Sequence, residues 1–463
     1  MNRERLTINT NLHEQNQHAS PVRPLKNNIV RMKRSVMILF FLMIICPVIL
    51  HGQKILTLKE CYNMATSANA LAGEKDAYSS ISMIKENNLS KGWLPSLDAN
   101  GSILYNSSVA DISGILGALP IPGIAGAIKP VPNEQYKITV DINQVIYDGG
   151  AIKSAKAIEK ADRSVNEKQV ETDLYKLRGQ INGYYFNLLL LSRQKELLNS
   201  WLGLINKRLL SLQSALNNGF IIKSDIDVLT SEKIKIEQQL TENEIRKTSL
   251  LKILSLVTGT DIDSSAELIP PAIPDETSAE LLRPELQLFD LRKEQLAAGV
   301  KMIDSKRMPK AFGFASMGYG NPPGSNFFKD EFASYYIVGA GIKWNIFDWN
   351  KAKNEKQLIF LQQGILDKRK TDLTDNLNRL LESKKAEIES LKSLIKTDSE
   401  LITLRKRISA SAESQYENGT ITATEYLNEI NSEKQALINS EIHKINLSLA
   451  SVEYLNISGN EIE

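Results

Sequence analysis

The sequence predicts a mainly α-helical chain in which long antiparallel helical hairpins are combined with four β-strands, and the whole arrangement occurs twice. The first observation is a set of motifs repeated 200 positions apart: Ile146-Tyr147-Asp148 and Ile346-Phe347-Asp348, Asn218-Gly219 and Asn418-Gly419, Val257-Thr258-Gly259 and Ile457-Ser458-Gly459. The second is an apolar spacing of three and four residues sustained over very long stretches, which indicates helices. The third is alternation of apolar and polar residues before each repeated aspartate, which indicates strands.

Residues 1–52 are predicted to be a leader that ends in a secretory signal peptide. A basic triplet, a short apolar core and a small-residue end follow one another at 32–34, 36–46 and 50–52. These are the three parts of a signal peptide. We therefore expect cleavage near Gly52, and we treat residues 1–31 as a non-native or dispensable start.

Beyond this leader, the sequence lacks the residues that most metal sites and many enzymes need. Cys61 is the sole remaining cysteine and His443 the sole remaining histidine. A disulfide within the chain and any catalytic or metal cluster of His and Cys are therefore excluded, which leaves only carboxylate chemistry open. The formal net charge of +2 does not indicate a nucleic-acid-binding surface. We expect no enzymatic activity, no cofactor and no nucleic-acid partner.

The first copy is predicted to span 53–259. Its elements are a helix, a strand region and a helical hairpin, expected at about 58–91, 96–147 and 150–258. The first arm of the hairpin keeps a heptad seam from Val170 to Leu216, interrupted only at Lys195. A helix over this arm would be roughly 100 Å long. It should end at the turn Asn218-Gly219.

The second copy is predicted to span 278–463, after a linker at 260–277 whose prolines exclude a long helix. Its elements follow in the same order, expected at about 278–307, 310–347 and 350–457. Its hairpin should turn at Asn418-Gly419, because glycine in the left-handed conformation commonly ends a helix and lets a second helix return.

Each strand region is predicted to hold two strands with one apolar and one polar face. The alternation runs from Ile138 to Asn143 in one strand and from Ile342 through Trp344 to Ile346 in another. The stretch 311–320 is less regular and places two pairs on opposite faces: Phe312 and Phe314, Met317 and Tyr319. The strands alone leave open whether the apolar faces cover the chain's own core or meet lipid.

Four strands are too few to close a membrane barrel, which uses at least about eight. A sheet with open edges cannot face lipid, because its unpaired N–H and C=O groups find no water there. If the apolar faces meet lipid, several copies must therefore pool their strands around a polar lumen. The Gly- and Pro-rich insert 109–133, which the second copy replaces with 321–331, should then lie at the outer end of the strands.

The order of exported leader, helix, Leu94-Pro95, strand pair, long helix, Asn-Gly turn and return helix, followed by a second round, resembles the TolC-type outer-membrane efflux proteins. The resemblance covers essentially the whole mature chain, and its specificity comes from the doubled arrangement. It implies a homotrimer with a twelve-stranded transmembrane β-barrel in outer-membrane lipid and a helical tunnel in the periplasm. It also implies two partners, a periplasmic adaptor (membrane fusion) protein and an inner-membrane transporter of the RND or ABC type.

The resemblance also implies roles at the turns. Four residues would form the tips that dock the adaptor: Asn218, Gly219, Asn418 and Gly419. Four would form the pore gate: Asp225, Tyr416, Glu425 and Asn428. In the family an arginine and two acidic residues follow the second turn, whereas this chain has Ile421, Glu425 and Asn428 there and keeps one acidic ring. The alternative is that Asp225 and Glu425 are ordinary helix-start acids, favoured by the helix dipole.

The predicted function is a passive exit duct of the outer membrane in a tripartite efflux or type I secretion system. Such a duct would carry small molecules or proteins from a pump to the exterior, and a carboxylate ring in its pore would favour cations. The alternative is a soluble periplasmic coiled-coil adaptor or scaffold without a barrel. That alternative leaves unexplained why two strand pairs occupy the same place in both copies.

Overall fold

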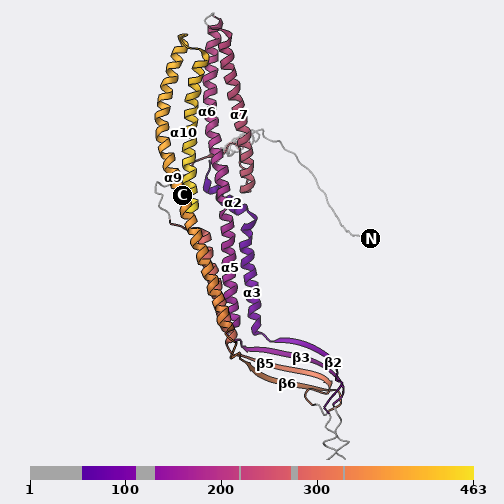
Figure 1. Ribbon diagram of the computed structural model, residues 1–463. Helices are drawn as coiled ribbons and strands as arrows, with labels where there is room; N and C mark the ends of the chain where they lie inside the picture. Colours follow the sequence, from indigo (N-terminus) through magenta and orange to yellow (C-terminus); the bar gives the residue numbers. More distant parts are fainter. Residues whose placement is uncertain (1–54, 111–130, 218–220, 273–279, 327–328, 463) are drawn as a thin grey trace, which may run out of the picture. The chain divides into compact units, whose positions relative to one another are not determined.

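The computed structural model describes residues 55–110, 131–217, 221–272, 280–326 and 329–462 (Figure 1). These residues belong to one unit, which contains the long helices and a four-stranded sheet. The predicted leader, most of the insert 109–133 and the turn Asn218-Gly219 lie outside the described residues.

The segment before the first strands is two helices rather than one. α2 (Leu58–Ala68) and α3 (Glu74–Ser90) are separated by a short 3-10 helix, η1 (Ala70–Gly73). Asn69 causes the break, because its backbone is extended and its side chain accepts a hydrogen bond from the amide of Leu71. Such local bonding competes with the helix. The prediction of a single helix over 58–91 was therefore wrong.

Each copy contributes a hairpin of long helices. In the first, α5 (Ala151–Tyr175) and α6 (Leu177–Asn217) lead to the return helix α7 (Lys223–Thr258). In the second, α9 (Lys351–Glu417) leads to α10 (Ala423–Ser458). α7 and α10 begin and end 200 positions apart. The first arm, predicted as a near-unbroken helix over about 150–216, is interrupted at Lys176. α9 continues through 67 residues, about 100 Å of helix.

The repeated aspartate forms the corner between strand and helix in both copies. Asp148 accepts hydrogen bonds from the amides of Gly150 at 2.8 Å and Ile152 at 2.6 Å. Asp348 accepts one from the amide of Ala352 at 3.0 Å. Amides in the first turn of a helix have no helical carbonyl to bond to. The aspartate therefore stabilises the start of α5 and of α9, which explains why this motif occurs twice.

The four-stranded sheet unites the two copies. α8 (Pro284–Arg307) precedes the second strand pair. The antiparallel order is β2 (Ser96–Tyr105), β3 (Glu134–Tyr147), β5 (Lys310–Asn321) and β6 (Ala333–Lys343). β3 pairs with β5 across the copies, and β2 and β6 are edges that find no second partner among the described residues. β6 ends before Trp344, so the predicted strand through Ile346 was too long; the Trp344 Nε1–H donates to the carbonyl of Arg307.

The register of the sheet separates apolar from polar residues. Directly opposite residues of antiparallel strands share a face. One such row, on the apolar face, is Leu97, Ile142, Ala315 and Val338. The next row, on the other face, is Asp98, Asp141, Ser316 and Ile337. The irregular stretch departs from this separation, because Phe312 and Phe314 share the face of Asp141. They lie over Gly341 and Gly339, where a Cβ atom would meet their rings at under 3 Å.

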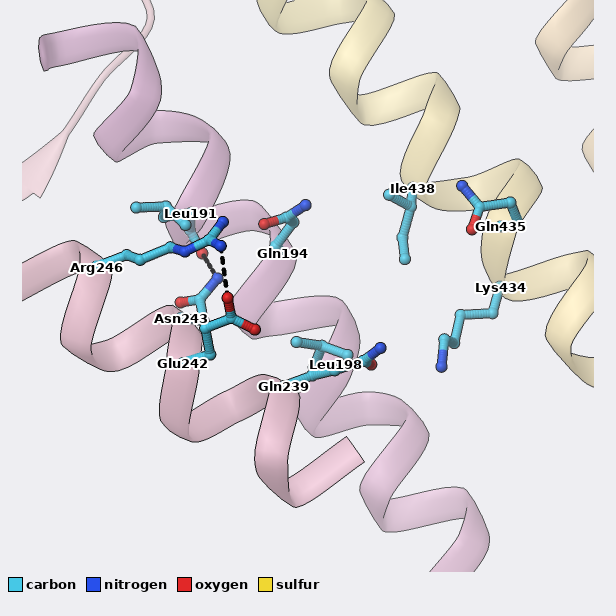
Figure 2. Close-up of a pocket in the computed structure, with 10 residues that line it drawn as sticks. All are labelled: Leu191, Gln194, Leu198, Gln239, Glu242, Asn243, Arg246, Lys434, Gln435 and Ile438. Atoms are coloured by element: carbon cyan, nitrogen blue, oxygen red, sulfur yellow. Dashed lines mark hydrogen bonds and ion pairs between the residues drawn. The ribbon is translucent and has the colours of Figure 1, made fainter. Parts of the chain in front are cut away.

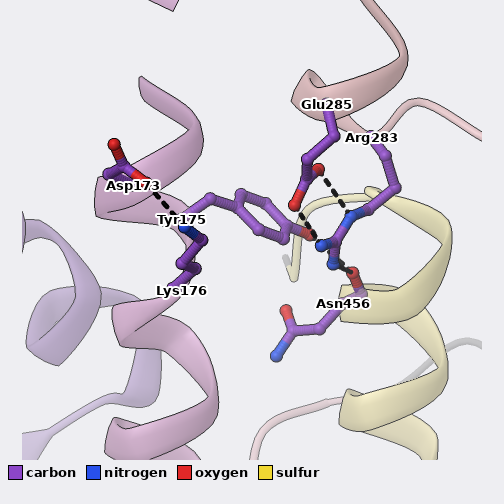
Figure 3. Close-up of polar contacts among 6 residues, drawn as sticks. All are labelled: Asp173, Tyr175, Lys176, Arg283, Glu285 and Asn456. Carbon is purple, nitrogen blue, oxygen red and sulfur yellow. Dashed lines mark hydrogen bonds and ion pairs between the residues drawn. The ribbon is translucent and has the colours of Figure 1, made fainter. Parts of the chain in front are cut away.

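The linker is held between the two hairpins. β1 (Ile55–Leu56) pairs in parallel with β4 (Glu267–Leu268), and the buried hydroxyl of Tyr185 donates to the carbonyl of Leu56 or of Ile269. A second contact joins α5 and the segment before α8 to the end of α10 (Figure 3). There the carbonyl of Asn456 accepts hydrogen bonds from the Tyr175 hydroxyl at 2.8 Å and from the Arg283 guanidinium at 2.9 Å. The C-terminal end of α10 is thus attached to both copies.

Candidate functional site

The polar face of the sheet carries a hydrogen-bonded carboxylate at its centre. Asp141 of β3 accepts from the Nδ2–H of Asn100 on β2 at 2.7 Å and from the hydroxyl of Thr139 at 2.9 Å. The hydroxyl of Ser316 on β5 also donates to it. Asp98 lies directly opposite Asp141 in the register. This face therefore presents ionisable and hydrogen-bonding groups from three strands.

The opposite face of the sheet is apolar and open. Every strand contributes exposed apolar side chains to it, among them Leu97, Ile103, Ile138, Val140, Met317, Tyr319, Tyr336 and Val338. Val338 is 74% exposed. An exposed apolar surface contributed by four strands is a place where lipid or another protein binds. No element of the described chain packs on this face closely enough to bury it.

The second turn has the geometry that the sequence predicts for an Asn-Gly tip. Gly419 has a left-handed backbone (φ +68°), and its amide donates to the carbonyl of Tyr416 at 3.0 Å. The Nδ2–H of Asn418 donates to the carbonyl of Ser414 at 2.8 Å. These bonds satisfy carbonyls at the end of α9. Both tip residues are exposed and accessible to a partner.

Two residues of the predicted gate, Tyr416 and Asp225, interact electrostatically. Tyr416 of α9 stacks on Tyr426 of α10, with ring centroids 5.1 Å apart and planes 4° apart. Burial, followed by the nearby negative charge of Asp225 in the first turn of α7, raises the pKa of Tyr416 to about 12. Tyr416 and Asp225 are thus brought together across the two hairpins. The Tyr416 hydroxyl has no hydrogen-bond partner among the described residues.

The other two predicted gate residues are arranged differently. Glu425 forms a capping box with Thr422 at the start of α10, accepting from the Thr422 amide at 2.8 Å and hydroxyl at 3.0 Å. These hydrogen bonds lower the pKa of the exposed Glu425 carboxyl. Asn428 is exposed one turn further along α10. The helix-start position considered for both acids is therefore present. Glu425 caps α10, and Asp225 lies in the first turn of α7, where Ile222 before the helix provides no side-chain cap.

Sequence reasoning missed the main polar link between the two tips. Arg208 of α6 forms ion pairs with Glu413 and, at 2.7 Å, with Glu417, both on α9. Its guanidinium also lies 5.9 Å from the ring centroid of Tyr426. No spacing in the sequence marks this link, because Arg208 lies ten residues before Asn218, whereas Glu413 and Glu417 lie five residues and one residue before Asn418.

A second polar link crosses between the hairpins further from the tips. The Lys434 ammonium of α10 lies 3.5 Å from the Glu232 carboxylate of α7, and both side chains are largely buried. Beside it lies a cavity of about 220 Å³ lined by residues of α6, α7 and α10 (Figure 2). Asn243, 4% exposed, donates there to the carbonyl of Leu191 at 3.1 Å. Arg246 at the cavity pairs with Glu242 of its own helix.

The described residues include no group of three or more His, Cys, Asp or Glu side chains positioned to hold a metal ion. His443 lies with its Nδ1 2.7 Å from the Asp398 carboxylate, which joins α9 to α10. Within the same residues, none of the helices is both long enough and apolar enough to cross a membrane.

No known protein-family profile and no curated protein matches this sequence. Solved structures match it. The CmeC outer membrane channel of Campylobacter jejuni aligns with a TM-score of 0.59 and 14% identity, over 88% of this chain and 86% of CmeC. The outer membrane protein VceC of Vibrio cholerae aligns with 0.59 and 15%, over 86% and 96%. The MtrE outer membrane channel of Neisseria gonorrhoeae aligns with 0.61 and 14%, over 87% and 89%.

At these identities the likeness concerns the fold. The chain has the TolC-type fold predicted from its doubled motifs, with long helical hairpins and four strands per chain.

Proposed function

We propose that this chain is one protomer of an outer-membrane channel that several identical copies close together. The observation that carries the proposal is the sheet, which is apolar and exposed on one face, carries a hydrogen-bonded carboxylate at the centre of the other, and is open at β2 and β6. Two open edges cannot lie in lipid, because each unpaired backbone group would go without a hydrogen bond. Edge-to-edge pairing of identical sheets removes both edges and encloses the polar face as a lumen.

Exposed residues of α7 and α9 support the same assembly. α7 and α9 carry exposed apolar side chains along their lengths: Ile234, Ile245 and Leu256 on α7, Phe360, Leu361 and Ile365 on α9. Large exposed apolar patches are unusual on monomers and mark interfaces. Neighbouring copies would bury these residues and continue the wall of the channel beyond the membrane. Homotrimers, with twelve strands in all, fit the four strands that each copy supplies.

The finer role that we propose is an exit duct of a tripartite efflux or type I secretion system, without enzymatic activity. Two of the solved structures of similar fold, CmeC and MtrE, are outer membrane channels, and this supports a transport role. In this proposal the tip residues Asn418 and Gly419, with Asn218 and Gly219 of the other turn, dock a periplasmic adaptor protein. Tyr416, Asp225, Glu425 and Asn428 line the constriction, and an inner-membrane transporter of the RND or ABC type delivers the cargo.

A pair of neighbouring substitutions tests the membrane assignment. Val338 faces the apolar side of β6 and Ile337 the polar side, next to Ser316 and Asp141 in the register. Val338→Arg should abolish recovery of the protein from the outer-membrane fraction, because a lipid-facing arginine costs about 2–4 kcal/mol at the bilayer midplane. Ile337→Arg, with the same chemistry one residue away, should still insert. Equal recovery of both variants as soluble protein would favour a scaffold instead.

Partners require a different measurement. We expect an adaptor and a transporter to co-purify with the full chain from detergent-solubilised envelopes. A variant in which Asn418 and Gly419 are both replaced by alanine should lose the adaptor while retaining oligomers, since both residues are exposed at the turn. Retention of the adaptor by this variant would remove the second turn from the docking surface.

A further inference from the structure

The strand pair β5–β6 ends in two lysines that lie directly opposite each other. Lys310 is the first residue of β5 and Lys343 the last residue of β6, and the register pairs them. Both lie on the face of the sheet that carries Asp141, at the end that adjoins α8 and α9 (Figure 1). Like charges directly opposite each other destabilise a strand pair. Neither ammonium group has an ion-pair partner among the described residues.

Two phenylalanines continue the same face along β5. Phe312 and Phe314 follow Lys310 at the spacing of two that keeps side chains on one face of a strand. Their rings lie across β6, over Gly341 and Gly339, and their centroids are 6.4 Å apart. The two side chains remain 37% and 36% exposed. The end of β5–β6 therefore presents two unpaired ammonium groups beside an open aromatic surface.

We propose that Lys310, Lys343, Phe312 and Phe314 form a binding site for organic anions with a flat apolar body. The two ammonium groups, with three N–H donors each, bind the carboxylate or sulfonate of such an anion and lose their mutual repulsion. The phenylalanine rings pack against its apolar body and remove apolar surface from water. This inference rests on the proposed channel function, in which this face lines the lumen and its inner end receives cargo from the helical tunnel.

The nearest carboxylates of the chain do not occupy the site. Asp141 lies in the row of Ser316, six residues along β5 from Lys310, which corresponds to roughly 20 Å. Charges exposed to water are largely screened beyond about 8 Å at physiological ionic strength. Asp348, the acid closest in sequence to the lysine pair, bonds to the start of α9 and lies 4.0 Å from the Arg307 guanidinium. An anion at the end of the sheet is therefore attracted locally by the two lysines.

Three probe molecules separate the charged part of the site from the aromatic part. The probes are 2-naphthoate, which has both features, 2-naphthylmethylammonium, which reverses the charge, and acetate, which lacks the rings. Binding to assembled full-length protein in lipid nanodiscs would be measured against empty nanodiscs. We expect 2-naphthoate to bind at least tenfold more tightly than either of the other probes. Added salt should weaken its binding, because salt screens ion pairs that are open to water.

Variants of the site test the same assignment. Lys310→Gln/Lys343→Gln and Phe312→Ala should each weaken 2-naphthoate binding severalfold. Lys137→Gln is the matched control, because Lys137 lies on the same face near the other end of β3, 5.9 Å from the ring centroid of Tyr335, and it should bind as the unaltered protein does. The double variant should unfold no earlier than the unaltered protein, since it loses two opposed like charges. Unchanged affinity of the double variant, or equal binding of 2-naphthylmethylammonium, would overturn the site.

Planar-bilayer recordings on the same preparations keep the site apart from the channel. Oligomers that conduct and bind 2-naphthoate only when both lysines are present would support the two together. Oligomers that conduct but do not bind 2-naphthoate would overturn the site and leave the channel standing. Oligomers that bind it through the lysine pair but never conduct would overturn the channel alone.

Discussion

Tyr416, near the end of α9, stacks face to face on Tyr426, near the start of α10. The contact involves the two rings alone, because the Tyr416 hydroxyl has no hydrogen-bond partner among the described residues. Burial and the charge of Asp225 raise the pKa of Tyr416 from 10.0 to about 12. A tyrosine whose pKa is raised by folding stabilises the fold below pH 10 and loses that contribution as the pH rises toward 12.

Replacing Tyr416 by phenylalanine should therefore change the pH dependence and little else. At pH 7 the variant should be as stable as the unaltered protein, because the ring stack is kept and no hydrogen bond is lost. Between pH 10 and about 12 it should lose less helical ellipticity than the unaltered protein, since one ionisation that opposes folding is gone. Coincident titration curves of ellipticity would show that Tyr416 does not limit alkaline stability.

The buried pair Glu232 and Lys434 should behave as a coupled unit. Each single change, Glu232→Gln or Lys434→Met, leaves a charge of the other residue largely buried, which should cost about 3 kcal/mol. The double variant Glu232→Leu/Lys434→Met should recover most of that loss, because no unpaired charge remains. Unfolding midpoints in detergent would measure the coupling. Strictly additive losses would mean that Lys235, 3.8 Å from the same carboxylate, already replaces Lys434 as its partner.

Two adjacent glycines test the corner between β3 and α5. Both have left-handed backbones, with φ +70° at Gly149 and φ +85° at Gly150. A Cβ atom at Gly149 would lie 2.7 Å from the Cβ of Met308, whereas one at Gly150 would meet nothing within 4 Å. Gly150→Ala should therefore cost only the conformational strain of about 1–2 kcal/mol. Gly149→Ala should cost more and reduce the yield of assembled protein, because two chain segments would have to move apart.

The long helices could be predicted from sequence because the same apolar spacing of three and four residues recurs many times along each of them. Apolar spacing placed the hairpin arms, and the Asn418-Gly419 turn placed the second tip. The breaks at Asn69 and Lys176 were missed because each depends on local bonding or packing that periodicity does not record. The pairing of β3 with β5 was also beyond the sequence pattern, since it joins strands about 175 residues apart.

The candidate site was predictable only in part. Tyr416 and Asp225 were named from a resemblance, and the fold brings them close. Arg208 was not named, because its partners lie on another hairpin about 205–209 positions away and no local motif marks them. Charge pairs between distant helices depend on how the helices are aligned, and this alignment is a property of the packed core around Tyr426. Sequence periodicity predicts each helix and leaves such alignment undetermined.

The two roles considered for Glu425 predict different results from two variants. Thr422→Ala and Glu425→Gln both weaken the same capping box, but only the second removes a charge. Because the cap lowers the pKa of Glu425, its stabilising effect is present above the unfolded pKa and is lost as the pH falls through the folded value. Both variants should therefore reduce the loss of tip structure on acidification, which hydrogen exchange at the start of α10 would measure.

If Glu425 also lines the constriction, Glu425→Gln alone should weaken block of the channel by divalent cations, because a ring of carboxylates in a narrow pore attracts them. Thr422→Ala should leave that block intact, and equal block in both variants would restrict Glu425 to its role in the helix cap.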